Sequence, residues 1–256
     1  NPISSNLTIM RTLLAPSLLN VAVENLKRGN HEGRLFELSN IYIPRQLPVT
    51  ELPEERLHLG FTAFGDKEDF FSLKGAMEML GRAFGLTFDY ERATDVPWLH
   101  PGISAHILCN GKRIGCFGKL ANDVTAELKL PKDSKNNQKI FLGEIDYVAM
   151  MEQVDPHFRY QPIPEFDTVQ RDLALVANEE VTCGEIVKEI HKACPRVGDV
   201  ELFDVYRGDQ LGEGKKSMAF TVHFVPDNKA LSAEEVDRFV KKILGNLKYR
   251  LSVEIR

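Results

Sequence analysis

The hydrophobic positions of the first 150 or so residues are spaced in two ways, and the spacing predicts both helices and strands. Apolar residues recur every three or four positions over 9–28 and 69–84, which predicts two helices, with Pro16 in the first turn of one and Asp69 as the N-cap of the other. Asn110-Gly111 is a strong signal for a type I′ hairpin turn. The other predicted elements are a short helix over 122–128 and strands over 34–43, 56–64, 87–91, 104–108, 113–118 and 139–146. We therefore expect an α+β domain with a mostly antiparallel sheet.

The last ninety or so residues predict the order β-α-β-β-α-β. Two capping boxes of the form S/T-x-x-E begin at Thr182 and Ser232, and each marks the start of a helix. The helices are predicted over 182–193 and 232–247, and the strands over 171–176, 200–206, 217–225 and 249–255. This order of elements is typical of the ferredoxin-like βαββαβ fold.

Three prolines, Pro156, Pro162 and Pro164, interrupt regular structure between the two regions, which predicts a linker over 151–165. We therefore predict two domains, 1–155 and 161–256, and a length of 256 residues suits this division. The chain begins Asn1-Pro2-Ile3 without a methionine, so we expect it to be a piece of a longer protein.

Composition excludes several classes of protein. With 43% hydrophobic and 27% charged residues, the chain has the usage of a globular protein, and no apolar run approaches the ~20 residues that cross a membrane. The net charge of −5 excludes a wholly basic nucleic-acid binder but not a local basic patch. The four cysteines contain no C-x2-C pair, so neither a zinc site nor a disulfide framework is predicted, and reduced thiols favour a cytoplasmic location.

No motif for catalysis stands out. The seven histidines are scattered without an H-E-x-x-H pattern, and neither a G-x-S-x-G elbow nor a phosphate-binding loop occurs. The glycine-rich stretch 208–217 resembles a phosphate loop only superficially, because it lies between two predicted strands and opens no helix. The residues alone thus predict a two-domain α+β protein without catalytic residues and without a metal site.

Several motifs follow one another in a fixed order. They are Asn1-Pro2-Ile3-Ser4, Met10-Arg11-Thr12-Leu13-Leu14, Asp69-Phe70-Phe71-Ser72-Leu73-Lys74-Gly75, His100-Pro101-Gly102, Gly115-Cys116-Phe117-Gly118, Arg171-Asp172-Leu173-Ala174, Leu202-Phe203-Asp204-Val205-Tyr206 and Lys215-Lys216-Ser217-Met218. Together they resemble the C-terminal part of the bacterial phenylalanyl-tRNA synthetase beta subunit family, which ends in a ferredoxin-fold anticodon-binding domain. The resemblance covers nearly the whole chain.

The resemblance implies a first module with the fold of a class II synthetase core, a mixed or antiparallel sheet with helices, that is not itself catalytic. Class II chemistry clamps ATP phosphates with arginines, a bidentate role that other residues fill poorly. The strand that corresponds to motif 2 carries Glu37 instead, and the strand over 115–120 lacks the motif 3 arginine. A carboxylate would repel the triphosphate, so we expect no adenylate formation and no cofactor in this chain, while the parent complex uses ATP and Mg²⁺.

The resemblance also implies partners. These are the alpha subunit, within an alpha2-beta2 tetramer that charges tRNA-Phe with phenylalanine, and tRNA-Phe itself. The helices over 11–26 and 70–84 are candidates for the alpha-subunit interface, and covering their own sheet is an equal alternative for both.

The second module would contact tRNA near the anticodon. From Gln161 onward the chain carries 14 Lys and Arg against 17 Asp and Glu, a net charge of −3, so any phosphate-binding surface must be local. Alternation turns Met218, Phe220, Val222 and Phe224 toward the helices and leaves Ser217, Ala219, Thr221, His223, Arg250 and Ser252 on the open sheet face. The candidate tRNA-binding residues are Arg171, Tyr206, Arg207, Lys215, Lys216 and Arg250. For each basic residue, a merely solvated surface charge is the alternative.

Two other functions remain open from the residues. A free-standing enzyme would need a site between the two domains that holds carboxylates or histidines with perturbed pKa values. A protein-interaction module would use the ferredoxin-like domain to bind a partner or a small ligand rather than RNA.

Overall fold

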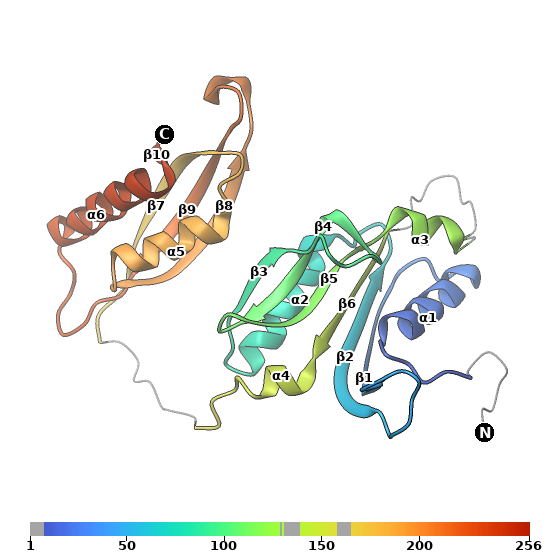
Figure 1. Ribbon diagram of the computed structural model, residues 1–256. Coiled ribbons are helices and arrows are strands. Elements are labelled where there is room, and N and C mark those ends of the chain that lie inside the picture. Colours follow the sequence, from blue (N-terminus) through green and yellow to red (C-terminus); the bar gives the residue numbers. More distant parts are fainter. Residues whose placement is uncertain (1–7, 129, 131–138, 158–164) are drawn as a thin grey trace. The chain divides into compact units, whose positions relative to one another are not determined.

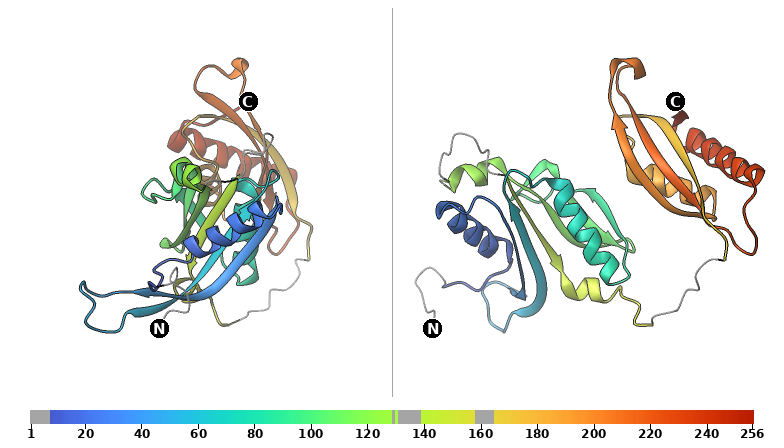
Figure 2. Two further views of the ribbon diagram at one scale, coloured as in Figure 1. Left: turned by 90° about the vertical axis from the view of Figure 1, so that its right-hand side faces the viewer. Right: turned by 180° about the vertical axis from the view of Figure 1, so that it is seen from behind.

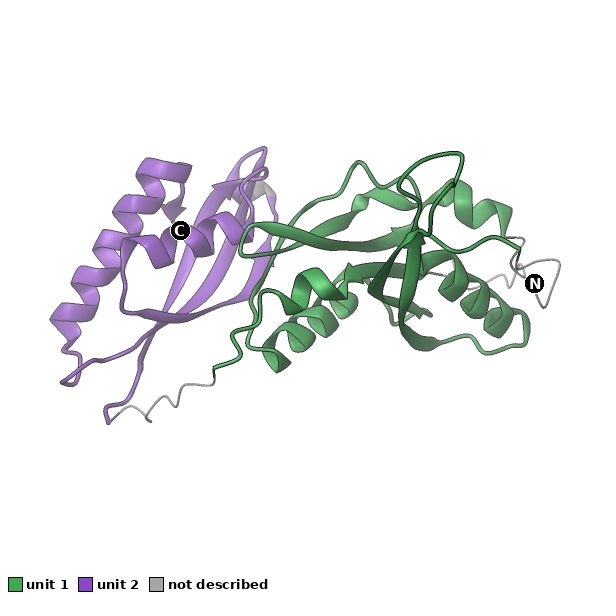
Figure 3. Ribbon diagram, turned by 60° about the horizontal axis from the view of Figure 1, so that its bottom comes forward, with its two compact units in different colours: residues 1–158 green, residues 159–256 purple. Residues whose placement is uncertain are grey.

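The computed structural model describes residues 8–128, 130, 139–157 and 165–256 (Figure 1). The chain divides into two compact units, residues 1–158 and residues 159–256, here called unit 1 and unit 2 (Figure 3). Each has its own sheet and its own buried core.

Unit 1 is built on a six-stranded sheet in which every neighbouring pair is antiparallel. Across the sheet the strands run in the order β1 (Gly33–Ile43), β2 (Glu54–Phe64), β6 (Ile140–Asp146), β5 (Lys112–Leu120), β4 (Leu99–Cys109) and β3 (Phe88–Arg92). The β4–β5 hairpin turns at Asn110 and Gly111, whose φ angles of 50° and 76° are those of the predicted type I′ turn. The predicted antiparallel α+β domain is confirmed.

Two helices cover opposite faces of this sheet (Figure 2). Helix α1 (Ala15–Lys27) packs on the face that carries Ile140 and Leu142, whereas α2 (Phe70–Ala83) packs on the face that carries Phe141. Asp69 caps α2 as predicted, since its side chain accepts a hydrogen bond from Ser72 N at 2.7 Å. Two short helices, α3 (Asn122–Glu127) and α4 (Tyr147–Met151), complete the unit, and α4 was not predicted.

Helix α1 begins on a buried carboxylate from the far end of the unit's sequence. Its first turn contains Pro16 as predicted, but no side chain of its own caps it. Instead Glu144 on β6, only 5% exposed, accepts the backbone N–H groups of Leu14 at 2.9 Å and Ala15 at 3.2 Å through Oε2. Its other oxygen lies 2.7 Å from His58 Nδ1. A negative charge here compensates both the orphan amides and the positive end of the helix dipole.

Unit 2 has the predicted β-α-β-β-α-β order. Its antiparallel sheet runs β10 (Glu254–Ile255), β7 (Val169–Asn178), β9 (Lys215–Phe224), β8 (Val197–Tyr206), and a short 3₁₀ turn, η1 (Asp209–Leu211), joins β8 to β9. Helices α5 (Cys183–Ala193) and α6 (Ala233–Leu251) bury the inner face of the sheet, and both begin with the predicted capping boxes. The ferredoxin-like fold is confirmed.

The predicted last strand over 249–255 is wrong in its first half. Helix α6 continues to Leu251 because the apolar stripe of Ile243 and Leu247 extends to that residue at helical spacing. The helix ends at Ser252, which adopts a left-handed φ of 53°, and only Glu254–Ile255 pair with β7. The end of the chain is therefore mostly helix where strand was expected.

Candidate nucleic-acid interface

The sheet of unit 2 has one face covered by helices and one face of small and polar side chains. Met218, Phe220, Val222 and Phe224 of β9 are buried in the core with α5 and α6, which confirms the predicted alternation. The opposite face, here called the open face, carries the residues between them and their cross-strand partners. These include Ser217 and Ala219 of β9, Val176 and Ala174 of β7, and Tyr206 and Asp204 of β8.

Tyr206 is the aromatic side chain on the open face. It is paired directly across from Ser217, and the guanidinium carbon of Arg256 lies 5.1 Å from the centre of its ring. Arg256 reaches this position because its N–H donates to Ala174 O at 2.8 Å and so extends the pairing of β10 with β7. An aromatic ring that is 36% exposed and a cation beside it are groups that sites for single-stranded nucleic acid use.

The basic residues predicted around this hairpin do not form one surface cluster. Lys216 lies on the inner face, is only 8% exposed, and donates from Nζ to Glu179 O at 2.7 Å. Arg207 donates to Glu179 Oε1 from Nη2 at 2.8 Å and from Nε at 3.0 Å, and Nε also lies 3.2 Å from Oε2. Lys215 is exposed on the outer side of the hairpin. Arg207 is also exposed, but like the buried Lys216 it is bound to Glu179.

The other two predicted basic residues lie away from the open face. Arg250 stands in the last turn of α6, where its guanidinium carbon is 5.6 Å from the ring centre of Tyr249. Its expected place on the open face is wrong because the strand that would have carried it is helix. Arg171 shares the inward parity of Leu173 on β7 and donates from Nη1 to Gln170 O at 3.1 Å. Their roles in RNA binding stay predictions.

Two residues that matter here were not predicted. Arg256 follows a strand of only two residues, too short for alternation to show which way its side chain points. Glu179 occupies the turn between β7 and α5, and no sequence motif marks a turn residue as a contact of a distant hairpin. The ion pair with Arg207 holds the pKa of Glu179 below its ordinary value.

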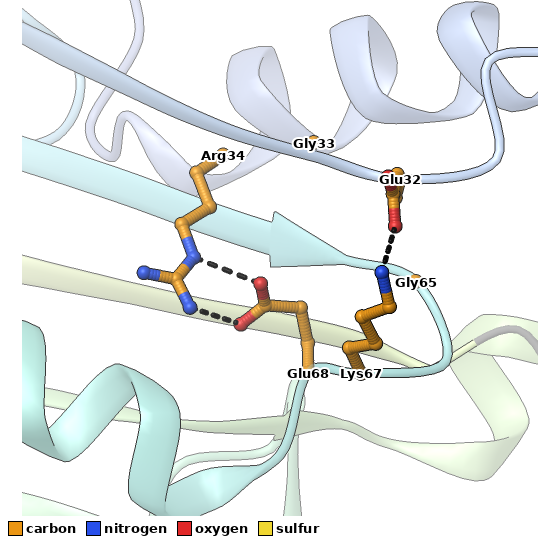
Figure 4. Close-up of a pocket in the computed structure, with 6 residues that line it drawn as sticks. All are labelled: Glu32, Gly33, Arg34, Gly65, Lys67 and Glu68. Atoms are coloured by element: carbon orange, nitrogen blue, oxygen red, sulfur yellow. Dashed lines mark hydrogen bonds and ion pairs between the residues drawn. The ribbon is translucent and has the colours of Figure 1, made fainter.

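Several charged groups of unit 1 pair with one another. A pocket of about 420 Å³ lies where β1 begins and β2 ends, and Arg34 there makes a bidentate pair with Glu68 at 2.8 and 3.0 Å (Figure 4). Glu37 pairs with Arg11 at 2.7 Å. Within the described ranges, no three His, Cys, Asp or Glu side chains gather as a metal site would require, and no helix is both long and apolar enough to cross a bilayer.

Two domain models match the chain, and the second of them defines its class. Residues 164–256 match the ferredoxin-fold anticodon binding domain, which places unit 2 in that class of domain. Residues 1–146 match the CLM domain of the phenylalanyl tRNA synthetase beta chain. The chain belongs to the phenylalanyl-tRNA synthetase beta chain family.

Curated relatives agree with this assignment. Phenylalanine–tRNA ligase beta subunits of Clostridium tetani and Staphylococcus epidermidis are 32% and 34% identical to this chain, over 100% and 96% of its length. The chain spans about a third of the length of these relatives, 32% and 31% respectively. A solved pyrrolysyl-tRNA synthetase from Desulfitobacterium hafniense is more distant, with 14% identity and a TM-score of 0.43 over 55% of this chain and 48% of its own.

Proposed function

We propose that this chain serves a phenylalanine–tRNA ligase as a scaffold and a tRNA contact and forms no adenylate itself. The observation that carries the tRNA contact is the open face of unit 2, where Tyr206 and Arg256 lie over small residues. The match of the same unit to an anticodon-binding domain supports tRNA as the nucleic acid. The substrate class is tRNA-Phe, bound near its anticodon, where unpaired bases can be splayed out and stacked.

Stacking, rather than phosphate attraction, supplies most of the affinity in this proposal. Unit 2 is acidic overall. Arg207 and Lys216 are both hydrogen-bonded to Glu179, which leaves Lys215 and Arg256 as the cations nearest to the open face. Each phosphate contact with single-stranded RNA contributes about 0.7 to the slope of log K against log salt. Two such contacts give a slope of about −1 to −2, shallow for a nucleic-acid binder.

The scaffold role falls to unit 1. Helix α2 buries Leu73 and Met77 against its own sheet but leaves Phe71 and Met79 73% and 68% exposed, with Gly75 open between them. This exposed apolar stripe favours α2 over α1 as the element that docks on the alpha subunit, since large apolar side chains in a row are costly in water. In the parent complex, an alpha2-beta2 tetramer of the cytoplasm, the alpha subunit would hold ATP, Mg²⁺ and the reacting groups.

The tRNA contact is tested by binding of the chain to tRNA-Phe and to a non-cognate tRNA over a salt series. Tyr206→Ala is compared with Tyr249→Ala, which removes an exposed tyrosine that also lies beside an arginine but stands on α6. Loss of one stacked base costs about 1–3 kcal/mol, so Tyr206→Ala should bind roughly 5- to 150-fold more weakly than the parent. Tyr249→Ala should bind as tightly as the parent. Absence of binding at low salt, or equal losses in both variants, would refute the proposal.

The scaffold role has a separate test. Phe71→Glu places a charge in the exposed stripe of α2 and should abolish co-elution with the alpha subunit while tRNA binding stays unchanged. Val21→Glu, at an apolar position of α1 that is 49% exposed, is the matched control and should co-elute normally. Loss of co-elution in the control alone would assign the interface to α1 instead.

A further inference from the structure

Glu179, in the turn between β7 and α5, contacts the β8–β9 hairpin through its backbone N–H, its backbone carbonyl and its carboxylate. The backbone N–H of Glu179 donates to Gly214 O at 2.8 Å, and its carbonyl accepts from Lys216 Nζ at 2.7 Å. Its carboxylate accepts from Arg207 Nη2 and Nε, at 2.8 and 3.0 Å to Oε1, with Oε2 3.2 Å from Nε. The three ties come from both ends of the glycine-rich connection over 208–214. They form what we call the Glu179 clasp.

The clasp lies next to Tyr206 in space as well as in sequence. Arg207 follows Tyr206 directly, and Gly208 follows Arg207 against the ring itself. A Cβ atom at Gly208 would collide with Tyr206 Oη and crowd Cζ, so the backbone of the connection forms a wall of the ring's site. Any shift of this connection therefore moves the wall against which the ring of Tyr206 rests.

Among the described residues, the connection holds an internal backbone hydrogen bond from Leu211 N to Gly208 O at 3.0 Å. Gly212 and Gly214 have φ angles of 84° and 73°, a backbone region that glycine enters easily, and a Cβ at either would meet nothing within 4 Å. Gln210 is exposed. A glycine-rich connection in open solvent is free to move unless its ends are fixed. The clasp fixes one end at Arg207 and the other at Gly214 and Lys216.

We propose that Glu179 is a positioning residue for RNA recognition, which holds the β8–β9 connection so that Tyr206 is presented to a nucleobase on the open face. The inference rests on the proposed tRNA contact and adds a residue that touches no RNA. It explains why a carboxylate stands beside an RNA-binding hairpin, where its charge alone would repel phosphates. Arg207 and Lys216, which the sequence suggests as phosphate ligands, instead hold the β8–β9 connection in place by binding Glu179.

The proposal is testable because removal of the Glu179 carboxylate has opposite effects on tRNA affinity in two cases. Affinity falls if Glu179 positions Tyr206, and it stays equal or rises if only the negative charge matters. Glu180 is the matched control, because it is the next residue, is exposed, and no hydrogen bond or ion pair of its side chain is found among the described residues. Glu179→Gln and Glu180→Gln remove the same charge one residue apart. If charge alone matters, both variants of the chain bind tRNA-Phe equally well or slightly more tightly than the parent.

The clasp predicts that Glu179→Gln binds tRNA-Phe about three- to tenfold more weakly than Glu180→Gln, with both chains melting at the same temperature. The swapped double variant Glu179→Arg with Arg207→Glu restores the pair at unchanged net charge and should recover binding to within about twofold. Equal affinities of Glu179→Gln and Glu180→Gln would overturn the proposal. So would a swapped variant no better than Glu179→Gln alone.

An NMR spectrum of the chain without RNA tests the positioning role of Glu179 separately from the proposed tRNA contact. The ring resonances of Tyr206 and the amide of Gly208 should shift in Glu179→Gln and stay in place in Glu180→Gln. If the parent chain fails to bind tRNA, the proposed function falls and takes the recognition role of Glu179 with it, whatever the spectrum shows. If the parent binds tRNA but the Tyr206 resonances do not move in Glu179→Gln, the positioning role alone is refuted.

Discussion

Replacement of Glu144 by alanine is expected to be among the most damaging single substitutions in unit 1. The carboxylate is 5% exposed and accepts from Leu14 N, Ala15 N and the His58 ring. Alanine leaves two backbone amides at the start of α1 and one imidazole without their partner. Helix α1 carries much of the cluster on its side of the sheet, so an undocked start also loosens apolar contacts.

The magnitude follows from the number of groups left unpaired. A buried donor without a partner costs about 1–3 kcal/mol, and two amides are affected. We expect a loss of about 4 kcal/mol. At an m-value of about 2 kcal/mol/M in urea, this lowers the unfolding midpoint by roughly 2 M.

The chain provides its own reporter for this experiment. Trp98 is its single tryptophan, and it packs against the cluster that α1 builds, so tryptophan fluorescence in urea follows unit 1 and not unit 2. Glu144→Gln keeps one acceptor oxygen and should lose about half as much. Glu91→Ala, an exposed position on β3, should stay within about 0.5 kcal/mol of the parent. A loss below about 1 kcal/mol for Glu144→Ala would refute the carboxylate as the anchor of α1.

Two further predictions concern titration. Burial would raise the pKa of Glu68, but hydrogen bonds from Arg34 and Ser72 outweigh it and hold that pKa below the ordinary value of 4.5. A carboxylate with a lowered folded-state pKa stabilises the folded chain at pH values above its unfolded-state pKa. Glu68→Gln should therefore lower the free energy of unfolding by about 1 kcal/mol at pH 7 and by nothing once the pH falls below the folded-state pKa. An equal loss at pH 7 and pH 2 would contradict this. Burial, with Glu144 and Asp95 adding to it, raises the pKa of Cys116 to about 12. About one thiol in 10⁴ is then ionised at pH 8, so iodoacetamide should spare Cys116 in the folded chain and modify it in urea, as peptide masses would show; rapid modification in the folded chain would contradict the burial.

Much of the fold is predictable because its signals are local. The capping boxes at Thr182 and Ser232 each provide hydrogen-bond acceptors for two backbone N–H groups that the helix leaves unpaired, and both helices begin directly after those residues. Asn110-Gly111 defines a hairpin by the φ angles that it tolerates. Strand alternation on β9 needs nothing beyond one covered face. In each case the physical cause lies within four residues of the signal.

The parts that failed depend on distant contacts. Lys216 looks like a surface cation, but its parity on β9 turns it inward, where the carbonyl of Glu179 receives it. Glu144 gives no sign that it will cap a helix 129 positions earlier. The prediction of a strand over 249–255 is wrong in its first half because the helical stripe that ends at Leu251 prevails over the strand preference of Tyr249, Val253 and Ile255.

The placement of Tyr206 shows how one irregular residue can decide a binding face. On β8, Leu202 is paired with Phe220 on the inner face, so strict alternation would turn Tyr206, four residues later, inward as well. The register shifts between Leu202 and Asp204, which leaves Phe203 as an extra residue and inverts the faces beyond it. Tyr206 thereby reaches the open face opposite Ser217. Because a bulge bends the edge strand and breaks its pairing, the same residue also makes β8 a poor template for another strand.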